Sequence, residues 1–148
     1  MIDRFSRFSL SISEIYRYWH QITVSEMEKY ELKSSCAIYL IALNRHPEGI
    51  TAAQLSGICG RNKADVSRAA AELERKGFLL REGAHYRALL KLTAEGKQAA
   101  ENICERAGKA VEAGGKGLSP EKRAVFYETL EQIAANMKEM SQKGIPEK

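Results

Sequence analysis

The sequence predicts a mainly helical protein with one short β-hairpin, and three patterns in its 148 residues carry that prediction. Apolar residues recur at three- and four-residue spacing over most of the chain, which is the periodicity of amphipathic helices. Two short helical patterns between residues 51 and 76 are separated by a glycine-containing turn. Two apolar segments around Glu82-Gly83 follow them and are typical of a hairpin. This order of helix, turn, helix and hairpin indicates a winged helix-turn-helix.

The N-terminal segment, residues 2–30, has the pattern of one long amphipathic helix. Its apolar stripe consists of Phe5, Phe8, Ile12, Ile15, Trp19 and Ile22. A stripe with this many aromatic side chains must be covered by other parts of the protein. The core of the same chain and a second copy of the chain are both candidates, and we expect a mixture of the two.

A second helix is predicted from Leu32 to Arg45. Its side chains are apolar nearly all round, which indicates a central, buried helix. The sequence His46-Pro47-Glu48-Gly49 ends it, because proline disfavours helix in the residue before it and glycine follows.

The first helix of the helix-turn-helix is expected to begin after Thr51, whose hydroxyl can accept hydrogen bonds from free backbone amides. Leu55 and Ile58 are three residues apart and are expected on its buried face, and Gly60 supplies the turn.

The second helix is expected to begin at Asn62, with Asp65 in a capping-box-like position. Its buried stripe consists of Val66, Ala69, Ala70 and Leu73. Lys63, Ser67 and Arg68 fall outside that stripe, so this helix is expected to present them to a partner. Gly77 is expected to end the helix.

The hairpin is predicted as two strands, Phe78 to Arg81 and Tyr86 to Leu92, joined by residues 82–85. It would form a short wing. Arg81, His85 and Arg87 are near its expected tip, where a basic side chain can enter a minor groove of DNA.

Two further helices are predicted after the hairpin. Thr93 caps the first, which runs to about Val111, and residues 113–117 form a break rich in glycine. In the second, Ser119 is the cap and Pro120 the first helical residue. Its apolar stripe is Val125, Phe126, Leu130, Ile133, Met137 and Met140. We therefore predict three parts: an N-terminal dimerisation helix (1–32), a winged head (33–93) and C-terminal dimerisation helices (94–148).

Charge and composition narrow the classes of function. The net charge is +4, and residues 51–93 contain eight Lys or Arg against four Asp or Glu, a local balance of +4 that favours a nucleic-acid partner. No run of 18 apolar residues predicts a membrane span, and the N-terminus does not resemble a secretory signal. Three widely spaced cysteines form no disulfide framework and suit a reducing cytoplasm.

Catalytic and metal-binding motifs are not expected in this chain. The sequence contains no glycine-rich phosphate loop, nucleophile elbow or paired carboxylates in a pocket-like context, so we predict that the protein is not an enzyme and needs no cofactor. His20, Cys36, His46 and His85 lack the spacing of metal-ligand pairs, so no metal site is predicted.

Five short segments, in order, resemble the MarR family of bacterial transcriptional regulators over essentially the whole chain. They are Pro47 to Thr51, Asp65 to Arg68, Glu72 to Phe78, Leu92 to Gly96 and Leu118 to Glu121. The resemblance implies a homodimer held by the N- and C-terminal helices, with two winged heads on a pseudo-palindromic operator. It also implies a repressor whose heads change their spacing in response to a small ligand or an oxidation event.

The family's DNA contacts transfer to Asn62, Lys63, Ser67 and Arg68, at the start of the recognition helix. Lys63 is expected to contact phosphate, and Arg68 to read a guanine edge or clamp a phosphate. The alternative for both is an ordinary solvated surface charge. The family's acidic-basic wing signature is reduced here to Tyr86-Arg87-Ala88, in which Arg87 is the candidate contact.

Tyr16, Trp19, His20, Cys36 and Tyr39 are candidates for a pocket that binds a small aromatic or phenolic effector. The simpler interpretation is that these side chains are core, since aromatic stripes at helical spacing usually are. Two alternative functions stay open: a winged-helix protein-interaction module without a DNA role, and a regulator that senses oxidation through a cysteine thiol such as Cys36.

Overall fold

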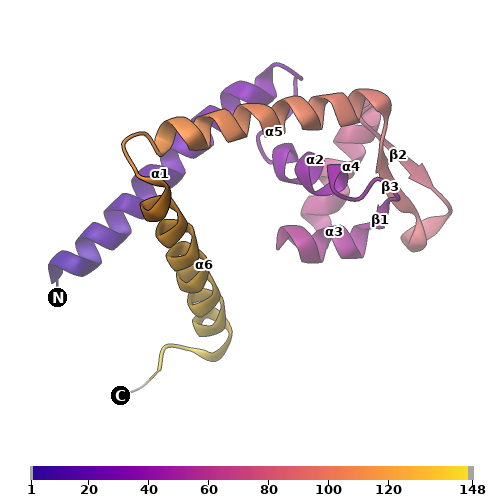
Figure 1. Ribbon diagram of the computed structural model, residues 1–148. Helices are drawn as coiled ribbons and strands as arrows, with labels where there is room; N and C mark the ends of the chain where they lie inside the picture. The colour runs from indigo at the N-terminus through magenta and orange to yellow at the C-terminus, as the bar shows by residue number, and fades with distance from the viewer. Residues whose placement is uncertain (1, 147–148) are drawn as a thin grey trace. The chain divides into compact units, whose positions relative to one another are not determined.

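The computed structural model of the chain describes residues 2–146. Six α-helices and a small antiparallel sheet follow the predicted order (Figure 1). Their bounds are α1 Ile2–Glu28, α2 Cys36–Asn44, β1 Ile50–Thr51, α3 Ala52–Cys59, α4 Lys63–Arg75, β2 Leu79–Glu82, a 3-10 turn His85–Arg87, β3 Leu89–Leu92, α5 Ala94–Gly114 and α6 Pro120–Lys143. The mainly α fold with a winged helix-turn-helix is confirmed.

Contacts divide the chain into two compact units, Met1–Ala107 and Gly108–Lys148. The first unit contains all of the hydrophobic core, which is centred on α2. Leu40 of α2, Leu73 of α4 and Leu90 of β3 are fully buried there. We call the segment from Met27 to Ile103 that carries this core the head. The assignment of the outer helices to dimerisation is not tested by this division and stays a prediction.

α2 is shorter than predicted, because it begins at Cys36 rather than near Leu32. The end of α1 explains the difference. Glu31 has a positive φ of 55°, and the amide of Leu32 donates to the carbonyl oxygen of Met27 at 3.2 Å. This turn reverses the chain after α1, so residues 29–35 are used in the connection instead of extending α2.

The start of α3 is organised as predicted. Thr51 Oγ1 accepts a hydrogen bond from the amide of Gln54 at 3.2 Å, and Gln54 Oε1 accepts one from the amide of Thr51 at 2.8 Å. These two bonds form a capping box. The prediction that Ile58 is buried is wrong, since it is 53% exposed and Cys59 packs in its place. In so short a helix the buried face runs from Leu55 to the residue four positions on.

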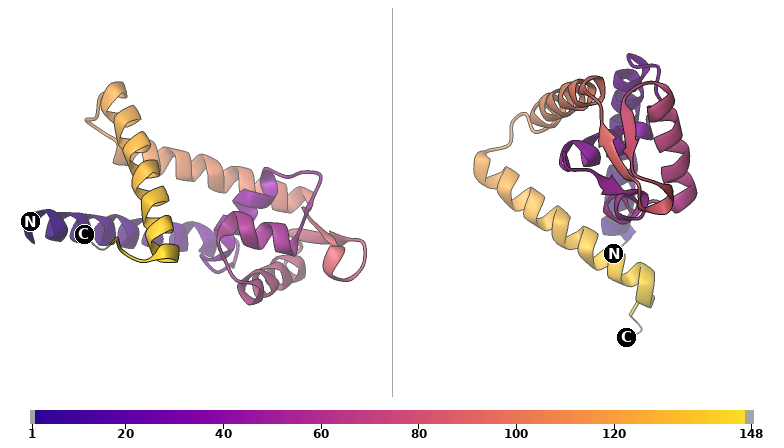
Figure 2. Two further views of the ribbon diagram at one scale, coloured as in Figure 1. Left: turned by 90° about the horizontal axis from the view of Figure 1, so that it is seen from below. Right: turned by 90° about the vertical axis from the view of Figure 1, so that its right-hand side faces the viewer.

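The wing is a hairpin of two four-residue strands. Leu79 lies opposite Leu92 and Glu82 opposite Leu89, and β1 pairs with the outer side of β3, which gives the order β1-β3-β2. The hairpin projects beyond the helices of the head in Figures 1 and 2. The second strand begins at Leu89 instead of Tyr86. His85 has a φ of 57° and accepts a hydrogen bond from the amide of Ala88, which closes a 3-10 turn where the strand was expected.

The junction between the wing and α5 is closely packed. Thr93 Oγ1 donates to the carbonyl oxygen of Gly77 at 2.6 Å and accepts from the amide of Gly96 at 3.0 Å. A Cβ atom at Gly96 would lie 1.9 Å from the carbonyl oxygen of Phe78. Only glycine permits the first turn of α5 to lie this close to the backbone that leaves α4.

In the second unit, α6 begins as predicted. Ser119 Oγ accepts a hydrogen bond from the amide of Lys122 at 3.3 Å, and Pro120 is the first helical residue. Arg123 donates to the carbonyl oxygen of Gly115 at 3.0 Å and pairs with Glu112, which fixes the turn between α5 and α6. α6 buries none of its described residues: Val125, Phe126, Leu130 and Met137 of its predicted apolar stripe are exposed in the single chain, and Ile133 and Met140 are half-buried.

Candidate nucleic-acid interface

The turn between α3 and α4 holds the second helix in place. Gly60 adopts the left-handed conformation with a φ of 60°, and the amide of Arg61 donates to the carbonyl oxygen of Ser56 at 3.1 Å. Asn62 Oδ1 then accepts a hydrogen bond from the amide of Asp65 at 2.8 Å, so α4 begins at Lys63 with the predicted cap. A helix fixed at its N-terminus in this way presents its first two turns in one orientation.

One face of α4 is exposed and carries small side chains around two arginines. The helix buries Val66, Ala69, Ala70 and Leu73, as predicted. The opposite, exposed face consists of Ala64, Ser67, Arg68, Ala71 and Arg75. Small neighbours leave long side chains room to reach outward and allow the helix to come close to a partner surface. Lys63, at the first helical position, is also exposed.

Arg68 is paired with a carboxylate on its own helix. Its Nη2 donates to Oδ1 of Asp65, three residues earlier, while the Arg68 side chain stays 72% exposed and that of Asp65 40% exposed. The capping box expected at Asp65 is not formed, because its carboxylate is used in this pair and only its backbone amide takes part in the cap. Asn62, Lys63, Ser67 and Arg68 thus lie together at the start of one helix.

The positive charge of residues 51–93 is partly matched by nearby carboxylates. Besides Arg68, at least three more of its basic residues form ion pairs: Lys76 with Glu31 at 2.9 Å, Arg81 with Glu74 at 2.9 Å, and Lys91 with Glu82 at 2.6 Å. Arg81 and Lys91 belong to the strands of the wing. Pairing reduces the electrostatic attraction that the base of the wing can offer to a polyanion.

Arg87, the predicted wing contact, lies in the 3-10 turn and is exposed. It is placed on the hairpin connection, well separated in sequence from the residues at the start of α4. The structure therefore offers a basic residue at the tip of the wing and a cluster at the start of α4.

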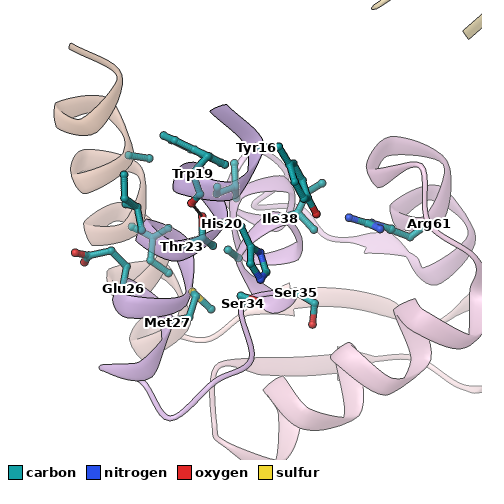
Figure 3. A pocket seen from close by; sticks show the side chains of 15 residues that line it. Tyr16, Trp19, His20, Thr23, Glu26, Met27, Ser34, Ser35, Ile38 and Arg61 are labelled. Carbon is teal, nitrogen blue, oxygen red and sulfur yellow. Dashed lines mark hydrogen bonds between the residues drawn. The ribbon is translucent and has the colours of Figure 1, made fainter. Parts of the chain in front are cut away.

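A cavity of about 420 Å³ lies between α1, the start of α2 and α5. Trp19, Ile22, Met27, Ile38, Ile41 and Ile103 supply much of its apolar lining. Tyr16 and His20, whose rings stack at 6.1 Å between centroids, contribute polar atoms. Figure 3 shows Arg61 on the far side of the cavity from Trp19, with its guanidinium directed toward Tyr16.

Three of the five predicted pocket residues, Tyr16, Trp19 and His20, line this cavity, whereas Cys36 and Tyr39 are not among its described lining residues. α2 turns those two side chains toward the core, where both are buried, and presents Ala37, Ile38 and Ile41 to the cavity instead. Sequence reasoning missed Arg61. The only local signal was a basic residue directly before the helix cap.

Burial raises the pKa of the Cys36 thiol to about 11, and the nearby Glu72 carboxylate acts in the same direction. Burial also raises the pKa of the Cys59 thiol. Because the thiolate is the reactive form, both groups are poor sensors of oxidants near neutral pH. Among the described residues, no group of three or more His, Cys, Asp or Glu side chains is arranged to hold a metal ion.

Comparison with known proteins shows which family this chain is similar to. The sequence model of the MarR family matches residues 30–88, from the end of α1 to the wing. Over these residues the chain is similar to the MarR family. No curated protein matches the chain by sequence. Within residues 2–146, no helix has both the length and the apolar character needed to cross a membrane.

Solved structures of MarR-family regulators are similar to nearly the whole chain. A MarR transcriptional regulator from Methanosarcina mazei Go1 superimposes with a TM-score of 0.80 at 23% identity, over 91% of this chain and 92% of that one. A putative MarR family regulator from Listeria monocytogenes, complexed with 26mer DNA, gives 0.79 at 22%, over 93% and 95%. MepR from S. aureus, in a complex with DNA, gives 0.79 at 20%, over 88% and 97%. At these identities, the likeness shows that the chain shares the fold of these structures.

Proposed function

We propose that the protein is a transcriptional regulator that binds double-stranded DNA in the cytoplasm as a homodimer and represses the genes beside its operator. The observation that carries the proposal is the exposed face of α4, with its fixed N-terminus, small side chains and Arg68. This combination suits insertion into the major groove, where Arg68 meets base edges and Lys63 meets phosphate. The DNA complexes of the similar regulators support it.

The first experiment is selection of bound sequences from a random DNA pool with the purified protein. A two-fold symmetric dimer is expected to recover a pseudo-palindrome with half-sites ~10 bp apart, one turn of the DNA helix. The recovered sequence, called the operator below, then serves as the probe in gel-shift assays. Recovery of no sequence above background would contradict the proposal.

The second experiment tests the interface on α4. We expect Lys63→Ala/Arg68→Ala to abolish specific operator binding while the protein stays folded. The matched control is Lys97→Ala/Lys116→Ala, which removes the same charge from exposed positions outside the helix-turn-helix. Unchanged affinity in the first variant would show that α4 is not the recognition helix.

A winged-helix module that binds only proteins is the main alternative. A DNA-binding protein that neutralises several phosphates loses affinity log-linearly with salt, with a slope of about −0.9 per phosphate contact. Gel-shift titrations between about 50 and 200 mM salt distinguish a DNA-binding regulator from a protein-interaction module. A flat dependence, together with an empty selection, favours the protein-interaction module.

The apolar stripes of the outer helices support the proposed homodimer. Phe5, Phe8, Ile12 and Ile15 of α1 are exposed in the single chain, and α6 buries none of its described residues. Amphipathic helices of this length need packing against an apolar partner to be stable in water. Sedimentation equilibrium is expected to give twice the chain mass of 16.5 kDa.

The cavity supports the proposed response to a small aromatic effector. Its apolar lining suits a ring, and Arg61 adds one cation that suits an acidic group. Trp19 is the only tryptophan and lines the cavity, so its fluorescence reports occupancy. We expect benzoate to change Trp19 fluorescence and to weaken operator binding, and the neutral benzamide to act less strongly. An Arg61→Gln variant that still prefers benzoate would contradict the role of Arg61.

A further inference from the structure

The Asp65–Arg68 pair places an acid beside the arginine that is expected to read DNA. Both residues lie in the first two turns of α4, and their side chains form an ion pair along the exposed flank of the helix. An isolated pair of exposed charges contributes little to folding stability, so stability is a poor reason for an acid at this position. The acid at Asp65 acts mainly on the Arg68 side chain, because the ion pair limits the positions that the guanidinium can reach.

Asp65 is held on the side of the helix that faces a polar cleft of about 290 Å³. Lys33, Ser35, Tyr39, Arg61 and Glu72 line this cleft together with Asp65 and Arg68. Burial raises the pKa of the Tyr39 hydroxyl, and the negative charge of Asp65 adds to that shift while Arg61 opposes it. Asp65 therefore lies within electrostatic range of both Tyr39 and Arg61, and its backbone amide is fixed by the Asn62 cap at 2.8 Å.

Arg68 is consequently tethered at one edge of the exposed face of α4. An arginine without a tether on this face can reach any nearby phosphate, and phosphate contacts carry no sequence information. Reading guanine requires the two donors of the guanidinium to meet O6 and N7 together, in one plane and orientation. A carboxylate that accepts from one side of the planar fork restricts the orientations left to the other side.

We propose that Asp65 is a positioning residue that sets DNA specificity through Arg68. It holds the guanidinium in the orientation that reads a base edge, and its own negative charge opposes binding driven by phosphate attraction alone. The inference rests on the proposed function, since it assumes that α4 binds DNA. According to this inference, a substitution at Asp65 changes the affinity for DNA and the preference for one DNA sequence in different directions.

The test is Asp65→Asn, which keeps the size and shape of the side chain and removes its charge. Each variant is titrated against the selected operator and against a scrambled duplex of the same length and composition. We expect affinity for the scrambled duplex to rise about three- to tenfold and the operator preference to fall about tenfold, in the range of one bidentate base contact. The salt dependence on scrambled DNA is expected to steepen by about 0.9, one added phosphate contact.

Glu72→Gln is the matched control for charge. Glu72 lines the same cleft and has the same charge, but its carboxylate accepts a hydrogen bond from the amide of Lys33 at 3.5 Å, which a glutamine oxygen can also accept. It is expected to raise affinity for both duplexes equally and leave their ratio unchanged. Asp65→Glu, which retains a carboxylate near Arg68, is expected to restore part of the operator preference.

A double-mutant cycle with Arg68→Ala decides whether Asp65 acts through Arg68. In the Arg68→Ala background, Asp65→Asn is expected to leave the operator preference unchanged. The inference is overturned if Asp65→Asn alone does not alter the preference, or if it alters it equally in both backgrounds. A wild-type protein with no operator preference would instead overturn the proposed function, and with it this inference.

Discussion

The head and the outer helices differ in where their apolar side chains go. In the head, Met27, Leu40 and Leu73 are fully buried within a single chain. In the outer helices, by which we mean residues 5–22 of α1 and all of α6, large apolar side chains such as Phe5 and Phe126 are exposed. The head is therefore self-sufficient as a folded unit, whereas the outer helices have the pattern of surfaces made for a partner.

This difference separates two kinds of information in one chain. Residues of the head specify a structure, and we propose that residues of the outer helices specify the assembly of two chains. Substitutions should then fall into two groups, those that lower the free energy of unfolding of the head and those that leave it unchanged but alter assembly. Four substitutions, ordered by their expected effect on that free energy, test the separation.

Leu73→Ala is expected to have the largest effect, a loss of about 2–5 kcal/mol in the free energy of unfolding. Leu73 is fully buried at the centre of the core, so the change leaves a cavity there. Urea titration followed by circular dichroism measures the loss. The same change at Leu10, which is 69% exposed and lies off the α1 stripe, should alter stability by less than ~0.5 kcal/mol. Equal losses of unfolding free energy at Leu73 and Leu10 would show that the head and the outer helices do not differ in this way.

Gly96→Ala is expected to cost about 1–3 kcal/mol, because the added methyl group would overlap the carbonyl oxygen of Phe78 and force α5 to shift. Gly108→Ala is its control on the same helix, where an added Cβ meets no atom within 4 Å. There the substitution should stabilise by about 0.4–1 kcal/mol, since alanine loses less backbone entropy in a helix. Thermal unfolding of the two variants should therefore shift in opposite directions.

Glu26→Gln is expected to cost about 1 kcal/mol at pH 7. Glu26 accepts hydrogen bonds from Lys29 at 2.7 Å and from Arg106 of α5 at 3.1 Å, and these partners lower the pKa of its carboxyl below 4.5. A depressed folded-state pKa contributes stability that is present above the unfolded pKa and is lost as the pH falls through the folded pKa. Wild type and variant should therefore converge in stability as the pH falls from 4.5 through the lowered folded-state pKa of Glu26. A difference that persists once this carboxyl is protonated would show that packing, not charge, is responsible.

Phe126→Asp is expected to leave the unfolding of the head nearly unchanged and to abolish the dimer. Phe126 is 46% exposed on the apolar stripe of α6, so a charge there opposes burial against a second copy. Sedimentation at several concentrations measures the mass, and urea titration of the monomer measures the head. Glu128→Asp, a change of side-chain length on the same helix, is the control. A head that unfolds along with the dimer would mean that it is not self-sufficient.

Local signals allowed much of the fold to be predicted from sequence. The caps at Thr51, Asn62 and Ser119 are formed by side chains three residues from the amides they accept from, so the information lies within one helical turn. The strand β1 was not predicted, because Ile50 and Thr51 are extended through pairing with Leu90 and Leu89, about forty residues away. The 3-10 turn at His85 was not predicted, because a positive φ is usually indicated by a glycine and here the residue is a histidine.

In the candidate site, too, features set by local sequence could be predicted, whereas features set by side-chain conformation or distant contacts could not. The exposed face of α4 follows from helical periodicity, so Lys63, Ser67 and Arg68 could be named in advance. The pairing of Arg68 with Asp65 depends on which rotamers the two side chains adopt, and periodicity does not specify that. The cavity draws its lining from three helices and from the turn that contains Arg61, and periodicity within one helix does not bring these parts together. For this reason Arg61 was not predicted, and the predicted Cys36 and Tyr39 are not among the described lining residues.

The closely packed junction between the end of α4 and the start of α5 also determines how much the length of the wing can vary. Thr93 donates from its side chain to Gly77 and from its amide to the carbonyl oxygen of Phe78, so the backbone is closed on itself before β2 begins and after β3 ends. The fifteen residues between Gly77 and Thr93 form an excursion that leaves and returns at one fixed point. Insertions or deletions at the hairpin connection can therefore change how far the hairpin extends while the junction of the two helices is preserved.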